Sequence, residues 1–326
     1  MKTIQSVRYQ LTVTTVAMVL AAGALANDDV TITQTDGKAT VKIAGQLFTE
    51  YVFQGHSKPI LYPVIGPHGI EMTRHYPIKD GVDNEALDHP HQKSLWFTHG
   101  NVNGVDFWAE YPRNNEENPF GRIVQQKFEL IDNGFRTSDN WVAADGTVVC
   151  TDTRTLGFGT NEAGRYIDIQ IALHASHGDV TFRDTKEGTM GIRTNPLLRL
   201  TADEKRGNHT ALGNCLNSEG IEGKDIWGKR ASWVDYWGPI NDHTVGIAIF
   251  DHPSNPRHPT WWHARTYGLV AANPFGIHDF EQKAEGAGDM LVPSGQTATF
   301  RYRFLFHEGN AKQADVPGQF ERFAKE

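Results

Sequence analysis

Apolar and polar residues alternate with a period of two along most of the chain. Residues 39–53 alternate and include β-branched and aromatic side chains, and the Asp36-Gly37 pair before them is typical of a hairpin turn. Further runs that predict strands lie at 60–65, 123–131, 147–155, 166–175, 244–250, 267–272 and 297–306. Helical periodicity is scarce, and residues 318–325 are the best candidate for a short charged helix. The pattern therefore predicts a mostly β protein.

Many strands at short spacing, with little helix between them, favour a large antiparallel β-sandwich. No low-complexity linker and no shift in composition divides the chain, so we expect residues 27–326 to form a single domain. Residues 202–229 are polar and irregular. They predict a long surface excursion, which is a candidate rim over a binding site.

The first residues have the layout of a secretory signal peptide. Lys2 and Arg8 precede an apolar stretch at 11–22, and the Ala-Leu-Ala sequence at 24–26 matches a small-x-small cleavage site. A transmembrane helix needs about 20 strongly apolar residues, whereas this stretch is shorter and interrupted by threonines. We therefore expect cleavage after Ala26, no membrane span, and a mature protein that is periplasmic or secreted.

Net charge and cysteine content limit the remaining possibilities. The formal net charge of −8 argues against nucleic-acid binding, which requires a basic face. Cys150 and Cys215 are the only cysteines. In an oxidising compartment they could form a disulfide, or they could remain two buried free thiols; the sequence leaves both open.

Histidines are concentrated in two windows that lie far apart in the chain. Eleven of the fifteen belong to them: His56, His68, His75, His89, His91 and His99 in the first, and His243, His252, His258, His263 and His278 in the second. Five of the eight tryptophans lie in or beside the same windows, and the tripeptide Asp-His-Pro occurs at 88–90 and again at 251–253. We therefore predict one polar site built from both windows.

In the first window, His89 and His91 would point to the same face if the chain is extended there. Two imidazoles on one face can bind a divalent metal or act as an acid with its orienting partner. The glutamate that a cupin-type metal site would place shortly afterwards is missing, because Leu95 and Trp96 stand there. Alternatively, Asp88 caps a turn and the histidines bond to the backbone.

Two tryptophans follow the first histidine pair. Asn103-Gly104 predicts a type I′ turn that returns Trp108 towards Trp96. Flat aromatic faces beside carboxylates and amides are a common way to hold sugars, although each ring could equally fill the core.

In the second window, prolines at 253, 256 and 259 exclude a helix and predict an ordered, exposed loop. In a strand, His263 and Arg265 would share a face, and a guanidinium suits a carboxylate or an oxyanion. Arg193, in the Gly-Ile-Arg sequence at 191–193, could add a basic contact or form a surface salt bridge.

These motifs, taken in order, resemble a family of exported bacterial proteins of unknown function labelled PmoA. The matching segments are 88–97, 100–108, 191–193, 251–259, 262–265 and 273–276, and the resemblance spans roughly residues 50–308. It implies a β-sandwich similar to the galactose mutarotase-like supersandwich, in which sugars lie on a concave sheet beside a histidine acid and a carboxylate base. The nucleophile-elbow, Walker, Rossmann and Cys-x-x-Cys patterns do not occur in the sequence.

The leading hypothesis is an exported carbohydrate-active hydrolase, lyase or epimerase that uses acid/base chemistry on a sugar or a uronic-acid-containing glycan. The predicted catalytic residues are His89, His91, His252 and His263, with Asp251 as orienting group or base. The predicted substrate-binding residues are Trp96, Trp108 and Tyr236 as stacking walls, Arg193 and Arg265 as anion-binding groups, and Asn255. One alternative is a metal-dependent enzyme with His89, His91 and a later histidine as ligands; another is a non-catalytic glycan-binding protein.

Overall fold

The computed structural model describes residues 30–110 and 120–326. The predicted signal peptide at 1–26 lies outside the described residues, so its cleavage stays a prediction. Within those two ranges, no helix has both the length and the apolar character needed to cross a bilayer.

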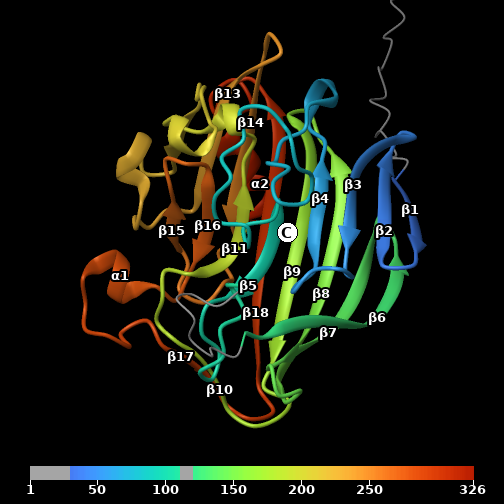
Figure 1. Cartoon of the computed structure of the whole chain (residues 1–326), viewed down its shortest axis with the longest axis vertical. Helices are drawn as coiled ribbons and strands as arrows, with labels where there is room; N and C mark the ends of the chain where they lie inside the picture. The colour runs from blue at the N-terminus through green and yellow to red at the C-terminus, as the bar shows by residue number, and fades with distance from the viewer. Residues whose placement is uncertain (1–29, 111–119) are drawn as a thin grey trace, which may run out of the picture.

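Two eight-stranded antiparallel sheets make up most of the structure (Figure 1). In spatial order, the first sheet contains β1 (Val30–Thr35), β2 (Lys38–Ile43), β3 (Gln46–Val52), β4 (Ile60–Val64), β5 (Leu95–His99), β11 (Gly188–Arg193), β16 (Leu269–Asn273) and β15 (Trp261–Ala264). The second contains β12 (Asn214–Asn217), β13 (Trp233–Ile240), β14 (His243–Asp251), β18 (Thr297–Glu308), β9 (Gly164–His174), β8 (Val148–Thr160), β7 (Gly134–Val142) and β6 (Arg122–Ile131).

Short elements complete the fold. They are the ribbon of β10 (Val180–Phe182) and β17 (Met290–Val292), the helices α1 (Ile277–Glu281) and α2 (Val316–Phe323), and the 3₁₀ turns η1 (Pro67–Gly69), η2 (Pro196–Leu198), η3 (Glu204–Arg206) and η4 (Gly223–Ile226). The predicted C-terminal helix is therefore present but begins two residues earlier than expected. Asp315 caps it by accepting a hydrogen bond from Gly318 N, and Pro317 fits its first turn.

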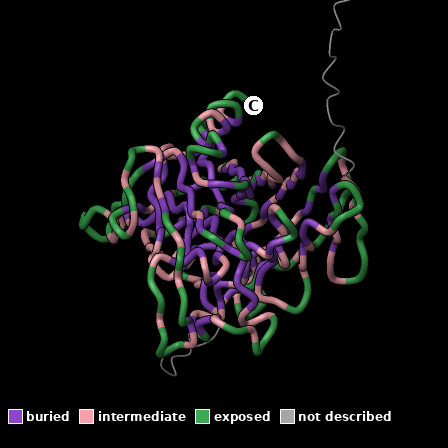
Figure 2. The backbone as a smooth tube through the Cα atoms, turned by 90° about the horizontal axis from the view of Figure 1, so that it is seen from above, coloured by how far each residue is buried: buried purple, intermediate pink, exposed green. Residues whose placement is uncertain are grey.

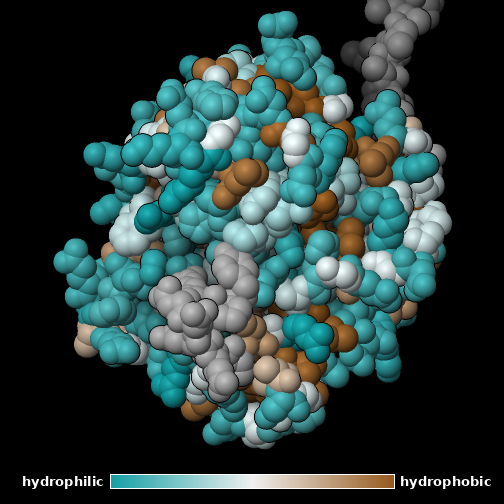
Figure 3. Space-filling view, in the orientation of Figure 1, coloured by the Kyte–Doolittle hydropathy of each residue, from teal (hydrophilic) through white to brown (hydrophobic). Residues whose placement is uncertain are grey.

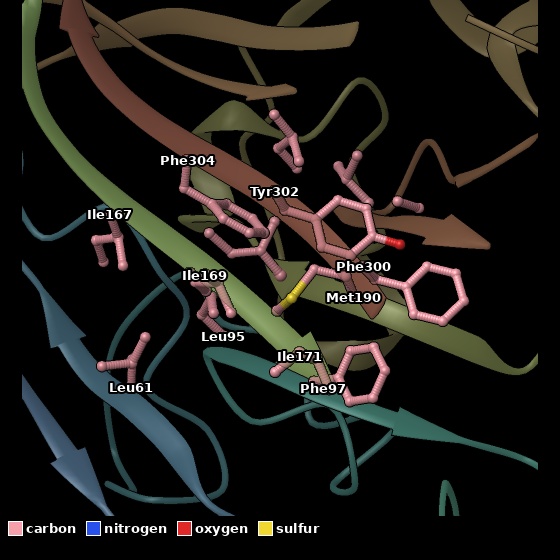
Figure 4. Packing of buried hydrophobic residues seen from close by; sticks show 14 of the residues in the cluster. Leu61, Leu95, Phe97, Ile167, Ile169, Ile171, Met190, Phe300, Tyr302 and Phe304 are labelled. Atoms are coloured by element: carbon pink, nitrogen blue, oxygen red, sulfur yellow. The ribbon is translucent and has the colours of Figure 1, made fainter. Parts of the chain in front are cut away.

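The main hydrophobic core lies between the two sheets. Figure 4 shows side chains of the first sheet, such as Leu95 and Met190, meeting Ile169 and Phe304 of the second. Buried backbone runs through the middle of the molecule, and exposed backbone is concentrated at its edges and loops (Figure 2). Each fully buried Leu, Ile or Phe stabilises the fold by roughly 1.5–3 kcal/mol relative to exposure. The predicted β-sandwich is confirmed.

Most of the predicted strands are present, including the hairpin at Asp36-Gly37 between β1 and β2. The run at 39–53 is in fact two strands, β2 and β3, because Ala44 and Gly45 both adopt positive φ and form a tight turn. The pattern did not predict β1, β7, β10, β12, β13 and β17, nor three strands of the first sheet, β5, β11 and β15. All residues of these three strands are buried, so they lack the alternation that marks a half-exposed strand.

Cys150 and Cys215 are both free and buried. Cys150 lies in β8 and Cys215 in β12, which is five strands away in the same sheet. At about 4.8 Å per strand the two are separated by roughly 24 Å, far beyond the reach of a disulfide. The disulfide alternative is therefore wrong.

Candidate functional site

The outer face of the first sheet positions the candidate site. Strand pairing aligns Trp96, Gly191, Ala271 and His263 in one row across β5, β11, β16 and β15. The residues that alternate with this row, including Met190, belong to the core between the sheets. Because side chains alternate along a strand, the row points away from the core, and His263 lies on the outer face.

A pocket of about 700 Å³ opens on this face. It is lined by Leu87, Asp88, His89, His91, Gln92, Lys186, Glu187, Arg206, His263, Arg265 and Tyr267. The surface on the side of the molecule that Figure 3 shows is mostly hydrophilic. The structure thus brings together four of the predicted residues, His89, His91, His263 and Arg265, from the two distant windows.

The histidine loop of the pocket (residues 86–92) is organised by the buried Arg74. Its guanidinium donates to Asp88 Oδ1 at 2.6 Å and to the backbone oxygens of Ala86, Asp88, His89 and Gln92 at 2.9–3.2 Å. Gln92 N also donates to His89 O at 2.9 Å, which closes a turn, and His89 has a φ of +43°. The loop is therefore not extended, which was the condition for the two rings to share a strand face, and the chain turns here instead. The turn still brings the two imidazoles together, with the centroids of His89 and His91 5.8 Å apart.

Asp88 is held as a carboxylate beneath the pocket. Its Oδ1 accepts from Arg74 at 2.6 Å and from Arg193 at 2.8 Å. Burial would raise the pKa of this carboxyl, but the hydrogen bond with His89 and the charges of Arg193 and Arg74 outweigh burial and lower it. Oδ2 lies 3.1 Å from His89 Nδ1, so Asp88 can orient that ring and pair with it when the ring is protonated.

Tyr267 forms an aromatic wall of the pocket. It lies in the turn between β15 and β16, and its ring stacks on His89 with centroids 5.1 Å apart and planes 8° apart. The guanidinium carbons of Arg193 and Arg265 lie 4.6 Å and 5.6 Å from its centroid. Burial raises the pKa of Tyr267, and the charge of Arg193 offsets this only in part. The residue is thus a neutral phenol near neutral pH.

His263 has the properties of a neutral base. Its Nδ1 lies 2.5 Å from the backbone oxygen of Lys186. A carbonyl oxygen can only accept, so Nδ1 carries the hydrogen and Nε2 is left as the acceptor of the neutral ring. Burial lowers the pKa of His263, and the charge of Glu187 only partly opposes that effect.

Three predicted stacking residues do not line the pocket. Trp96, Trp108 and Tyr236 are 2%, 0% and 1% exposed. The Asn103-Gly104 turn does form, with φ of 51° and 89°, and brings Trp108 to 5.5 Å from Trp96. The two indoles then pack against each other beneath the surface, so they fill space and cannot stack on a ligand.

Arg193 is likewise 1% exposed, and its guanidinium is committed to Asp88 and Gln92. It supports the loop from below instead of meeting an anion from solvent, contrary to the prediction.

The structure separates Asp251, His252 and Asn255 from the pocket. Asp251 ends β14 in the second sheet and accepts hydrogen bonds from Asn255 Nδ2, Thr260 N and His258 at 2.7–2.9 Å. These bonds hold the proline-rich loop. His252 contacts Ser254 and packs on Phe323 of α2, so its place is structural as well.

The sequence analysis assigned no site role to several residues that line the pocket: Gln92, Lys186, Glu187, Arg206 and Tyr267. It also missed Arg74, which does not line the pocket but holds its histidine loop. Arg206 belongs to the segment predicted as a rim, so its presence agrees with that expectation. Tyr267 stands two residues after Arg265, but no pattern distinguished it from a strand residue.

Metal-ligating side chains converge elsewhere. Across residues 30–110 and 120–326, one group of three or more potential ligands was found: His68, His243 and Glu308. It does not include His89 or His91, so a metal site at those two residues stays a prediction without a converging third ligand.

Comparison with solved structures gives low-similarity matches. The 4-alpha-glucanotransferase from Thermococcus litoralis has 13% identity and a TM-score of 0.26, over 86% of this chain and 38% of that chain. A glycoside hydrolase family 97 enzyme from Pseudoalteromonas sp. strain K8 has 9% identity and a TM-score of 0.32, over 86% and 34%. A galactose mutarotase-like protein from Lactobacillus casei has 8% identity and a TM-score of 0.30, over 85% and 100%. The chain thus spans about a third of the first two proteins.

No curated protein sequence matches the chain. The predicted resemblance to a family of unknown function is confirmed, whereas the PmoA label stays a prediction. The sequence pattern of DUF6807, a family of unknown function, matches residues 38–321, and the chain therefore belongs to this family.

Proposed function

We propose that this protein is an exported carbohydrate-active enzyme that performs acid/base chemistry on a sugar bearing a carboxylate, such as a uronic-acid-containing glycan. The observation that carries the proposal is that His263 and Arg265 line the same pocket. One supplies a neutral nitrogen acceptor and the other a fixed positive charge.

Arg265 is the group best suited to hold the anion. Within the described residues it forms no ion pair with a carboxylate, and it lies between the rings of Trp227 and Tyr267 at 5.8 Å and 5.6 Å. Lys186 and Arg206 add positive charge to the rim, although acidic neighbours partly balance them. A guanidinium held by aromatic faces binds a carboxylate through two parallel hydrogen bonds.

This arrangement favours proton abstraction over glycoside hydrolysis. Most glycosidases need two carboxyl groups that flank the scissile bond, and here Asp88 is committed to Arg74 and Arg193. In a uronic acid, the carbon that bears the carboxylate carries an acidified proton. Nε2 of His263 would take this proton while Arg265 neutralises the charge that moves onto the carboxylate.

The second half of the reaction needs a proton donor. His91 or His89, on the histidine loop that lines the same pocket, would donate to the departing sugar oxygen and leave an unsaturated product. Alternatively, it would return a proton to the other face of the carbon and give the epimer. Both outcomes begin with the same abstraction by His263.

The test is incubation of the purified protein with uronic-acid-containing oligosaccharides and with neutral counterparts in D₂O. We expect deuterium incorporation, measured by NMR, or unsaturated product, measured by ultraviolet absorbance, from the uronic-acid-containing oligosaccharides only. His263→Gln should abolish both, and the double variant His89→Ala/His91→Ala should abolish the unsaturated product, while circular dichroism stays unchanged for both variants. His177→Gln, at an exposed histidine on another surface, is the matched control.

Turnover that survives in folded H263Q would contradict the assignment of the base. Saturable binding without any product would favour the glycan-binding alternative. Loss of turnover on treatment with a chelator would favour the metal-dependent one.

A further inference from the structure

A second polar cluster lies outside the pocket, where one end of the first sheet meets the second. It consists of His68 in the turn η1, His243 at the start of β14 and Glu308 at the end of β18. These three residues come from segments that are far apart in sequence, so the fold alone brings them together. We refer to them as the His68 cluster.

The spacing of the ligand atoms fits a single cation. One ligand atom from each residue lies within 4.8 Å of the others. His68 Nε2 and Glu308 Oε1 are 3.3 Å apart, which matches the separation of about 3.4 Å between two donors bound tetrahedrally to Zn²⁺ at 2.0–2.1 Å. His243, the third donor, therefore has to move by about 1 Å.

The backbone of η1 aims His68 at its partner. His68 has φ of 57° and ψ of 17°, a left-handed conformation that a residue with a side chain rarely adopts. In this conformation its ring faces that of His243, with centroids 3.7 Å apart and planes 12° apart. Stacked rings direct their lone pairs along parallel lines, so a bound cation requires one ring to turn. The partial exposure of the cluster leaves room for that rotation.

Charge around the cluster also favours a cation. A cavity of about 540 Å³ adjoins it, lined by His243 and by the carboxylates Glu162, Asp242 and Glu308, with no lysine or arginine among the lining residues described. Glu162 is paired with Arg322, which leaves Asp242 and Glu308 to give the cavity a negative potential.

We propose that His68, His243 and Glu308 bind a divalent transition-metal cation of the Zn²⁺ class and thereby link the two sheets. Two imidazoles and one carboxylate are a ligand set that zinc accepts, with the fourth position left to water. Since the three residues converge only in the folded chain, bound metal adds to stability by mass action. The site is independent of the pocket proposed for the sugar.

The experiment is a titration of the metal-free, tag-free protein with ZnCl₂ by isothermal titration calorimetry, with thermal unfolding recorded in parallel. We expect one site, and a rise of a few degrees in the unfolding midpoint at saturating Zn²⁺. His68→Ala and His243→Ala should each weaken binding by about 100-fold or more and remove the thermal shift. Glu308→Gln should weaken it less, since an amide oxygen still reaches the cation.

Two controls separate this site from the other histidines. His177→Ala should leave the titration unchanged, because that ring hydrogen-bonds to Ser176 away from the cluster. The double variant His89→Ala/His91→Ala should also bind Zn²⁺ like the wild type. Binding that survives in both H68A and H243A, that disappears only in the double variant, or that is absent from the wild type at millimolar Zn²⁺ would overturn the proposal.

Discussion

Arg74 fixes the geometry of the histidine loop more than any residue that lines the pocket. One buried guanidinium serves four backbone oxygens and the carboxylate of Asp88. Without Arg74 these oxygens would lose this donor, and in the described parts of the chain only His89 O has a second one, Gln92 N. A buried oxygen left without a partner costs about 1–3 kcal/mol. The positions of His89 and His91 are thus set from below.

We expect Arg74→Lys to destabilise the protein by about 2–4 kcal/mol in urea unfolding, because an ammonium keeps the charge but cannot reach all five acceptors. Arg136→Lys is the matched control. Arg136 is exposed and lies 3.9 Å from Glu129, so its replacement should change stability by less than about 0.5 kcal/mol. Equal effects of the two substitutions would refute the role given to Arg74.

The pH dependence of turnover should report the base. Burial lowers the pKa of His263 from its ordinary value of 6.5, and a base works only when it is unprotonated. The midpoint of the acid-side decline in kcat/KM should therefore lie below pH 6.5. NMR titration of the His263 ring provides an independent check. A decline centred above pH 6.5 would argue that another group is the base.

At the scale of elements, the turn between β15 and β16 carries Tyr267 into the pocket. Gly268 has a φ of +85°, and a Cβ at this position would lie 2.5 Å from Thr194 Oγ1. The turn is therefore restricted both by backbone conformation and by the approach of a neighbouring chain segment.

Gly268→Ala should destabilise the fold by about 2 kcal/mol or more and should weaken ligand binding, because Tyr267 must shift with the turn. Gly295→Ala is the control. Gly295 also has positive φ (+78°), but nothing lies within 4 Å of its Cβ position. It should show only the conformational cost of about 1 kcal/mol. Thermal unfolding of both variants measures the difference, and a G268A variant no less stable than G295A would contradict the steric argument.

Strands were predictable where one face meets the core and the other meets solvent, as in β9 with its alternating burial. In β5, β11 and β15 both faces are covered, so no alternation marks them. The correspondence is incomplete, because the alternating β7 was missed and the fully buried β16 was predicted. Clustering of histidines located both segments of the site. It could not separate His263 from His252, because the periodicity of a strand does not reveal the sheet to which it belongs.

Across the whole molecule, the core between the sheets contains a charged group in addition to its apolar side chains. Asp139 and Asp152 face each other across β7 and β8, and Arg154 approaches both carboxylates. All three side chains are almost fully buried. Two carboxylates therefore compete for one cation, and burial together with the charge of Asp152 raises the pKa of Asp139 to about 7.

This competition predicts a pH-dependent benefit from Asp139→Asn. The pKa of Asp139 is raised from 3.8 to about 7 in the folded state. The stability that the protonated carboxyl gives to the folded state is therefore fully present below pH 3.8 and is lost as pH rises towards 7. An amide does not ionise and avoids that loss. Relative to the wild type, D139N should gain stability between pH 4 and pH 7, by about 4 kcal/mol at most.

Urea unfolding of both proteins at several pH values measures this gain. The exposed Asp132→Asn serves as a control that should show no such trend. A D139N variant that loses stability relative to the wild type as pH rises would contradict the proposed ionisation.

The wide separation of the two cysteines has a practical consequence for producing the protein. Burial raises the pKa of the Cys150 and Cys215 thiols, and a thiol that resists ionisation reacts slowly with oxidants and alkylating reagents. The native chain consequently requires no disulfide-forming machinery. Recombinant synthesis in a reducing bacterial cytoplasm should yield the same folded molecule as synthesis coupled to export.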